Sequence, residues 1–183
     1  MYKVVCLIGK SGSGKDTLLQ RILALHPDLH EIISYTTRPQ RDYEVNGKDY
    51  YFISPTDFEN LLLSGDLVEA TRFNNWFYGT GRSVLKEDKI NIGVFNPDGI
   101  EALLLDKNIK IMVYYIQAED KTRIIRQLNR EDYPNIEEIF RRYKTDENDF
   151  YNLEFDYTPL KNESRKDIDK NVKKIYEEIV SFS

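Results

Sequence analysis

The fold is decided by the stretch Gly9-Lys10-Ser11-Gly12-Ser13-Gly14-Lys15-Asp16-Thr17, which has the spacing G-x-x-x-x-G-K of a phosphate-binding loop. Residues 2–8 before it form an apolar run of strand length, and residues 17–25 after it carry apolar side chains at helical spacing. Strand, glycine loop and helix in this order open an α/β domain. The alternative is a glycine-rich turn that only joins a strand to a helix, but the position of Lys15 favours a phosphate loop.

This loop predicts a site for ATP. Glycines let backbone N–H groups turn toward phosphate oxygens, and the helix that follows presents its positive N-terminal end. Lys15 is expected to reach the transferred phosphate, which makes it a predicted catalytic residue. Contacts to ATP are expected from Gly9, Ser11, Gly12, Ser13, Gly14, Lys15, Asp16 and Thr17.

The position after Lys15 departs from the usual motif. A Ser or Thr that binds Mg²⁺ normally stands there, whereas this chain has Asp16, and the hydroxyl comes one residue later at Thr17. Carboxylate oxygens are ligands that Mg²⁺ accepts. We therefore predict that Asp16 holds Mg²⁺, directly or through a water molecule, while Thr17 binds a phosphate.

Composition narrows the class of protein. A chain of 183 residues fits one domain with a sizeable core, and no apolar run approaches the roughly 20 residues of a membrane helix. The net charge of −5 argues against a broad nucleic-acid surface. Met1 leads straight into the first strand, and the single cysteine, Cys6, cannot form an internal disulfide. We expect a cytoplasmic protein with neither a membrane nor a nucleic-acid partner.

The α/β pattern returns later in the chain. Apolar strands are expected at 90–95 and 110–116, on either side of a helix at 98–105. A terminal helix is expected at 166–182, with Ile168, Val172, Ile175 and Ile179 spaced to face the core. This predicts a parallel core sheet formed from 1–33, 81–119 and 152–183.

Two polar segments interrupt that core. Residues 34–80 are expected to be strand-rich with a short helix at 56–63, and residues 120–151 are expected to form two helices around a break at 132–134.

The first polar segment carries a family resemblance. Its sequence includes Ser34-Tyr35-Thr36-Thr37-Arg38-Pro39-Gln40-Arg41, then Glu44-Val45-Asn46-Gly47-Lys48-Asp49-Tyr50-Tyr51-Phe52, then Glu69 and Tyr78-Gly79-Thr80. In order and spacing these closely resemble the GMP-binding region of guanylate kinases. The resemblance implies a P-loop fold with an inserted GMP-binding segment, a helical lid and transfer of phosphate from ATP to GMP or dGMP. It also implies substrate contacts from Ser34, Arg38, Arg41, Tyr50, Glu69, Tyr78, Gly79 and Thr80.

The residue types suit such an acceptor. Arg38 and Arg41 can make forked, charge-assisted contacts to a phosphate, and the phenols of Tyr50 and Tyr78 can add neutral donors. Singly, arginines are usually surface charges and tyrosines usually packing residues. It is their combination at this spacing that favours a phosphate site.

The residues expected to contact the base of the acceptor nucleotide favour guanine. Glu69, as an ionised carboxylate, only accepts hydrogen bonds, which suits the N1–H and N2–H₂ groups of guanine and repels the lone pair on N1 of adenine. Ser34 and Thr80 can donate to O6 of guanine. The competing explanation is an ordinary solvated glutamate.

The second polar segment, 120–151, predicts an arginine lid. Arg126-Gln127-Leu128-Asn129-Arg130 is similar to the guanylate kinase pattern R-L-x-x-R, and Arg142 resembles the family arginine from the opposite side of the lid. The resemblance implies that Arg126 binds ATP and that Arg130 and Arg142 are catalytic, stabilising transition-state charge. The alternative is a solvated helix face balanced by Glu131, Asp132, Glu137 and Glu138.

The last strand resembles the family's at residues 155–162, which implies that Asn162 lies at the adenine of ATP. Pro159 within it predicts an edge position or a bulge. The second core strand departs from the family pattern D-x-D-x-x-G, because the chain has Val94-Phe95-Asn96-Pro97-Asp98-Gly99. This suggests that the acidic metal ligand has moved to Asp16.

Two other functions are compatible with parts of the sequence. Ribose-bisphosphate phosphokinases of the same superfamily often carry the G-S-G-K-D run found at residues 12–16, and other nucleoside monophosphate kinases share the loop. Guanylate kinase-like binding modules keep the acceptor fold without catalysis. We favour the enzyme, with ATP and Mg²⁺ as cofactors, GMP or dGMP as substrate, and a monomer or homodimer as its state.

Overall fold

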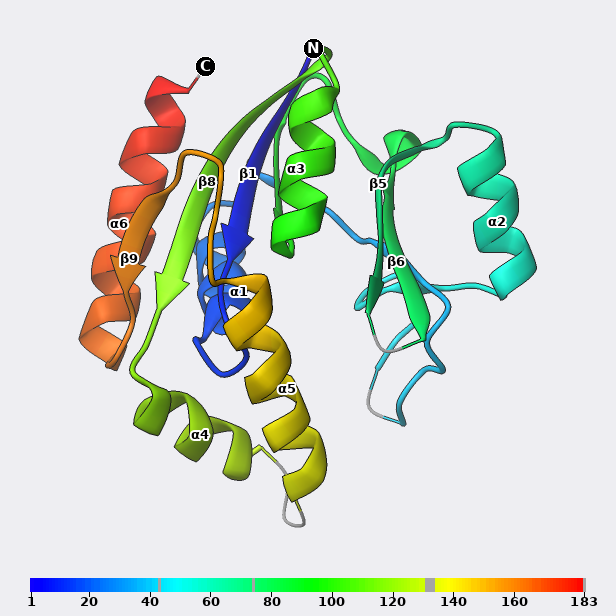
Figure 1. Cartoon of the computed structure of the whole chain (residues 1–183). Coiled ribbons are helices and arrows are strands. Elements are labelled where there is room, and N and C mark those ends of the chain that lie inside the picture. Colours follow the sequence, from blue (N-terminus) through cyan, green and yellow to red (C-terminus); the bar gives the residue numbers. More distant parts are fainter. Residues whose placement is uncertain (43, 74, 131–133, 183) are drawn as a thin grey trace. The chain divides into compact units, whose positions relative to one another are not determined.

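The computed structural model describes residues 1–42, 44–73, 75–130 and 134–182 (Figure 1). The chain divides into two compact units. One comprises Met1–Val4, Asp28–Gly93 and Asp98–Ile111, and the other comprises Val5–Pro27, Val94–Pro97 and Met112–Ser183.

Among the described residues, a sheet of five strands has the order β2-β7-β1-β8-β9. Their bounds are β1 Tyr2–Ile8, β2 His30–Glu31, β7 Ile90–Val94, β8 Ile109–Gln117 and β9 Thr158–Lys161. The pairs β2–β7 and β8–β9 are parallel. In β1 the residues from Val4 to Ile8 are fully buried, as the uninterrupted apolar run predicts for a strand covered on both faces.

The proline in β9 lies where the sequence predicts. Pro159 pairs with Tyr115 of β8, and β9 is the last strand in the sheet order. Proline has no N–H to donate, so it is tolerated at an edge where one side of the strand has no neighbour. The expected edge position is therefore confirmed.

The second unit holds the helices α1 Lys15–Leu25, α4 Asp120–Leu128, α5 Ile136–Asp149 and α6 Arg165–Ser181. Helix α6 packs against α1 and begins at a capping box in which Ser164 and Asp167 satisfy each other's backbone N–H. Val172, Ile175 and Ile179 are buried as their spacing predicts. Helices α4 and α5 agree with the expected helical segment. Residues 132 and 133 of the break predicted at 132–134 lie outside the described residues.

The first unit holds a four-stranded sheet in the order β4-β3-β6-β5. Its elements are β3 Tyr35–Thr36, β4 Tyr51–Phe52, α2 Pro55–Leu63, β5 Leu67–Phe73 and β6 Trp76–Gly81. The short helix η1 Arg82–Val84 and α3 Pro97–Leu105 complete the order of elements. The strand-rich character expected for residues 34–80 is confirmed, and β5 and β6 form an antiparallel pair.

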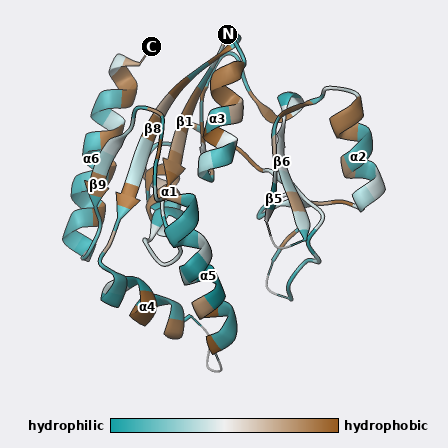
Figure 2. Cartoon of the chain, in the orientation of Figure 1, coloured by the Kyte–Doolittle hydropathy of each residue, from teal (hydrophilic) through white to brown (hydrophobic). Residues whose placement is uncertain are grey.

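Hydropathy follows these elements. Figure 2 shows hydrophobic colouring along β1 and mostly hydrophilic colouring along α5. In the described part of the chain, no helix combines the length and apolar character that a membrane span requires.

Candidate functional site

The phosphate loop joins β1 to α1, and its backbone conformation requires glycine at two positions. Gly12 and Gly14 have φ angles of 80° and 91°, in the left-handed region that favours glycine. A Cβ atom at Gly12 would lie 2.4 Å from the carbonyl oxygen of Arg123, and one at Gly14 would lie 2.6 Å from Nδ2 of Asn162. Both positions therefore exclude larger residues by conformation and by space.

The charged and hydroxyl groups of the motif stand at the start of α1. Lys15 is the first residue of the helix and is half-buried, while Asp16 and Thr17 are exposed in its first turn. An acidic side chain there is stabilised by the positive end of the helix even without a metal. Among the described residues, no three His, Cys, Asp or Glu side chains are grouped so as to hold a metal ion.

Mg²⁺ commonly keeps several waters and takes one or two carboxylates together with substrate phosphates. A single carboxylate beside a phosphate loop is compatible with that donor set. Asp16 thus fits as one ligand of a nucleotide-bound Mg²⁺.

Arg126 and Asn162 donate hydrogen bonds to the backbone of the loop. Arg126 donates to the carbonyl oxygens of Gly12 and Ser13 at 3.3 and 3.1 Å, and to those of Asn162 and Glu163 at 2.9 and 3.1 Å. Nδ2 of Asn162 donates to the carbonyl oxygen of Ser13 at 2.8 Å. The two residues expected at ATP therefore support the backbone of the loop.

Two atoms at this place are buried without a hydrogen-bond partner within the described ranges: Oγ of Ser13 and Oδ1 of Asn162. Such atoms are rare in folded proteins and often mark functional sites. Both belong to residues expected to bind ATP.

The lid arginines differ in their surroundings. Arg130 is exposed two residues beyond the end of α4. On α5, Nε of Arg142 donates to Glu138 at 2.7 Å, and Arg141 contacts the same carboxylate at 2.6 and 2.8 Å. The hydrogen bond from Arg141, reinforced by Arg142, lowers the pKa of Glu138 to about 2. Arg142 uses one of five guanidinium N–H donors in this contact, so phosphate binding through the others is compatible with it.

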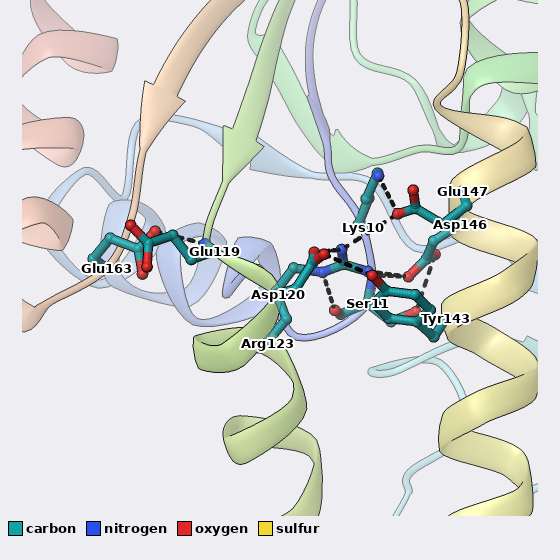
Figure 3. Close-up of polar contacts among 9 residues, drawn as sticks. All are labelled: Lys10, Ser11, Glu119, Asp120, Arg123, Tyr143, Asp146, Glu147 and Glu163. Carbon is teal, nitrogen blue, oxygen red and sulfur yellow. Dashed lines mark hydrogen bonds and ion pairs between the residues drawn. The ribbon is translucent and has the colours of Figure 1, made fainter.

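A cluster that sequence reasoning did not assign lies beside the loop (Figure 3). Arg123 of α4 is 1% exposed and forms ion pairs with Asp146 of α5 at 2.8 Å and with Asp120 at 2.7 Å. Asp146 accepts hydrogen bonds from Ser11, and Lys10 pairs with Glu147. Arg123 stands three residues before Arg126, so the two share one face of α4. This spacing is the sequence signal that could have pointed to Arg123.

The first unit contains the predicted acceptor residues. Arg38 is buried and donates to Oε1 of Glu44 at 2.7 Å, while Oε2 of Glu44 accepts the backbone N–H of Arg41 at 2.9 Å. Burial by itself raises the pKa of Glu44, but the hydrogen bonds from Arg38 and Arg41 outweigh it and leave that pKa lowered. Glu44 therefore holds the guanidinium of Arg38 and the backbone of Arg41, a role that its place in the motif did not assign.

Aromatic rings surround the same arginine. Cζ of Arg38 lies 5.6 Å from the ring centre of Tyr50 and 5.5 Å from that of Phe52. The rings of Tyr50 and Tyr78 meet edge to face at 5.9 Å. The structure thus brings together Arg38, Tyr50 and Tyr78, three of the residues expected at the acceptor phosphate.

The residues expected at the base form a hydrogen-bonded chain. In the β5–β6 pair Glu69 stands opposite Thr80, whose hydroxyl donates to Oε1 of Glu69 at 2.7 Å. Oγ of Ser34 lies 3.1 Å from Oγ1 of Thr80. At Gly79, a Cβ atom would lie 2.9 Å from the carbonyl oxygen of Glu69 and 3.0 Å from a ring carbon of Phe58, so a side chain there would crowd this chain.

The charge state of Glu69 differs from the expectation of a fully ionised carboxylate. Burial raises its pKa to about 7, against the opposing effect of hydrogen bonds from Thr80. The carboxyl therefore keeps its proton to a higher pH than an exposed glutamate does. Sequence could not predict this shift, because it depends on how completely β5 and its neighbours remove the side chain from water.

The end of β7 keeps the altered residues noted in the sequence. Asn96 follows the strand, Pro97 begins α3, and Asp98 is exposed in the first turn of that helix. Proline at a first helical position loses no hydrogen bond.

Comparison with known proteins identifies the family of the chain. The family model described as guanylate kinase matches residues 1–179. A guanylate kinase of Nostoc sp. is 45% identical over 83 residues, covering 45% of this chain and 42% of that protein. A guanylate kinase of Malacoplasma penetrans is 32% identical over 150 residues, covering 78% of this chain and 68% of that protein. The match to the Nostoc relative thus spans less than half of its length.

A solved structure shares the fold. The crystal structure of guanylate kinase from Anaplasma phagocytophilum matches with a TM-score of 0.70 and 22% identity, over 98% of this chain and 85% of that one. At this identity the likeness establishes the fold, an α/β P-loop architecture with a parallel core sheet. Since the family model covers nearly the whole sequence, the chain belongs to the guanylate kinase family.

Proposed function

We propose that the protein transfers the terminal phosphoryl group of ATP to GMP or dGMP, giving ADP and GDP or dGDP. The observation that carries this proposal is the acceptor arrangement in residues 34–80. It holds a buried carboxylate, Glu69, hydrogen-bonded to Thr80 at 2.7 Å, and Thr80 in turn lies near Ser34. The phosphate arginine Arg38 lies against the ring of Tyr50 in the same unit.

Glu69 recognises the base. Its deprotonated carboxylate accepts from N1–H and N2–H₂ of guanine. The hydroxyls of Ser34 and Thr80 donate to O6 after they turn away from their mutual contact and from Glu69. A site whose buried polar groups are left unpaired by the wrong base can discriminate by about 10⁴ or more.

At the acceptor phosphate, Arg38 and Arg41 supply charge, and Tyr50 and Tyr78 supply phenol donors. Glu44 orients Arg38 through the contact of 2.7 Å. A guanidinium held in place before the substrate arrives loses less entropy on binding.

The donor end binds ATP at the phosphate loop. Backbone N–H groups and Lys15 contact its phosphates, and Arg126 and Asn162 hold the loop backbone. Residues 120–151 act as the lid, from which Arg130 and Arg142 stabilise the charge of the transferred group.

Asp16 is the protein's contribution to a Mg²⁺ ion that enters with ATP. Bound Mg²⁺ neutralises phosphate charge in reactions of this class. Asp16 stands next to Lys15 in the first turn of α1, at the end of the helix where the phosphates are expected.

The setting of this activity is part of the same proposal. We place the enzyme in the cytoplasm, as a monomer or homodimer acting on small-molecule nucleotides. The net charge of −5 does not favour a broad nucleic-acid surface.

The test is a coupled assay of ADP release with ATP and Mg²⁺ against GMP, dGMP, AMP, UMP, dTMP and ribose 1,5-bisphosphate. We expect turnover with the guanine nucleotides alone, and its loss in Lys15→Ala. Turnover of the bisphosphate alone would assign a different phosphokinase. Binding of GMP without turnover of any acceptor would assign a binding module.

A further inference from the structure

Both backbone groups of Ser11 are held by side chains from outside the phosphate loop. Its N–H donates to Oδ2 of Asp146 at 2.8 Å, and its carbonyl oxygen accepts from Nε of Arg123 at 3.1 Å (Figure 3). Its hydroxyl also donates to Oδ1 of Asp146 at 3.2 Å. Asp146 and Arg123 themselves form an ion pair at 2.8 Å, so the two contacts to Ser11 are joined.

These contacts set the direction of the next peptide group. In a planar trans peptide the C=O of one residue and the N–H of the next point in opposite directions. With the carbonyl of Ser11 turned to Arg123, the N–H of Gly12 points away from that guanidinium. Arg126 and Asn162 hold the carbonyl of Ser13 in the same manner, which directs the N–H of Gly14.

Phosphate binding by such a loop depends on N–H groups that already point at the anion. Only glycine fits the backbone conformation at positions 12 and 14, and glycine is also the most flexible residue. External contacts are therefore needed to keep the loop in one arrangement. Arg123 and Asp146 provide them at Ser11.

A contribution to folding stability does not by itself explain the buried ion pair of Arg123 and Asp146. Arg123 is 1% exposed, and its charge is met by Asp146, by Asp120 and by the ring of Tyr143 at 5.3 Å. Burying charges costs desolvation free energy, and apolar side chains of similar volume often stabilise a protein equally well or better. What apolar residues cannot do is hold the N–H and C=O of Ser11.

We propose that Arg123 and Asp146 are positioning residues for the donor nucleotide, holding the backbone of Ser11 so that the loop is arranged for phosphate before ATP binds. The inference rests on the proposed function in taking ATP as donor. It concerns binding at the loop and does not depend on which acceptor is used.

The experiment uses the full chain with the single variants Asp146→Asn and Arg123→Met and the double variant Arg123→Met/Asp146→Leu. The double variant replaces the ion pair with apolar side chains and so separates loss of stability from loss of loop contacts. Ile179→Ala is the control, since Ile179 is 1% exposed in α6 and its truncation lowers stability without touching the loop.

Calorimetry with a non-hydrolysable ATP analogue gives the dissociation constant, thermal unfolding gives Tm, and steady-state kinetics gives KM for ATP and for GMP. We expect both single variants and the double variant to weaken analogue binding about tenfold, equal to about 1.4 kcal/mol. KM for ATP rises in parallel and KM for GMP stays within about twofold. The double variant regains most of the Tm, and Ile179→Ala loses Tm with unchanged analogue binding.

Recovery of both Tm and analogue affinity in the double variant would overturn the proposal, because the pair would then serve stability alone. Unchanged affinity for the ATP analogue in all variants would also overturn the proposal. If the wild-type protein binds the analogue but turns over no acceptor, the proposed function fails, while the binding comparison still decides the role of Arg123 and Asp146.

Discussion

Thr80 donates its hydroxyl hydrogen to the buried carboxylate of Glu69 at 2.7 Å, and burial raises the pKa of that carboxylate to about 7. A guanine base needs the deprotonated carboxylate, because its N1–H and N2–H₂ groups are donors. Under the proposed function, binding of GMP is therefore linked to release of a proton from Glu69.

The first prediction concerns the pH dependence of KM for GMP. The deprotonated fraction of Glu69 rises as pH passes through about 7, so KM should fall by about tenfold between pH 6 and pH 8. Steady-state kinetics at saturating ATP measures it. Glu69→Gln is the control, since ionisation of the GMP phosphate affects both proteins equally. An equal pH dependence in the two proteins would contradict the prediction.

The same carboxylate predicts a pH dependence of stability. The folded-state pKa of Glu69, about 7, lies above its ordinary value of 4.5, so the folded state retains a proton that the unfolded state has lost. The contribution of Glu69 is full below about pH 4.5 and is lost as pH rises through about 7, by up to roughly 3 kcal/mol. Urea unfolding of the wild type and Glu69→Gln at pH 5 and pH 8 should show the wild type losing free energy of unfolding relative to the variant. A constant difference at the two pH values would count against it.

Glu44 should matter for the acceptor although it touches no substrate in our proposal. Glu44→Gln removes the charge that holds Arg38 at 2.7 Å and weakens the acceptor for the backbone N–H of Arg41. We expect KM for GMP to rise about tenfold, because hydrogen bonds to charged groups contribute about 1.5–3 kcal/mol. KM for ATP should not change.

Glu59→Gln is the matched control for this variant, since Glu59 is exposed on α2 of the same unit. Equal kinetics for the Glu44 and Glu59 variants would remove Glu44 from the acceptor site.

Two neighbouring arginines allow a matched test of the lid. Arg141 and Arg142 both contact Glu138, yet only Arg142 is predicted to stabilise the transferred phosphoryl group. Arg142→Lys should lower kcat by about 10² or more, because an arginine that meets transition-state charge is worth about 10³–10⁵. Arg141→Lys should keep kcat within about threefold while losing the same kind of surface contact. Similar kcat values for the two variants would show that this role belongs elsewhere.

The metal assignment predicts a shift in Mg²⁺ requirement. Asp16→Asn removes the one carboxylate placed next to Lys15, so the Mg²⁺ concentration for half-maximal turnover should rise about tenfold. Titration of Mg²⁺ at fixed ATP measures it. Asp169→Asn, at an exposed position on α6, is the control. Unchanged Mg²⁺-dependent turnover in the Asp16 variant would place the ligand at another residue.

Much of the fold followed from local sequence. The apolar run of β1, the glycines after it and the spacing of Val172, Ile175 and Ile179 predicted a strand, a loop and a helix that the structure contains. Pro159 predicted an edge position or a bulge, and β9 is the last strand in the sheet order. These predictions succeed because periodicity and backbone conformation are properties of neighbouring residues.

The candidate acceptor residues were predicted from sequence, because their spacing in residues 34–80 resembles that of a family. The protonation state of Glu69 could not be predicted in this way. The pKa of Glu69 depends on burial by segments that come together only in the folded unit, and a pattern of residue types carries no information on that burial.

By itself, the sequence determined the phosphate loop and the α/β order of elements, since each depends on residues close along the chain. The candidate contacts to nucleotide were predicted from separate motifs that resemble a family. Tertiary structure alone decided that Arg123 and Asp146, 23 residues apart, contact each other and hold Ser11, more than 100 residues away. The reason is physical: the desolvation of Arg123 is compensated only where packing brings α4, α5 and the loop within hydrogen-bond distance.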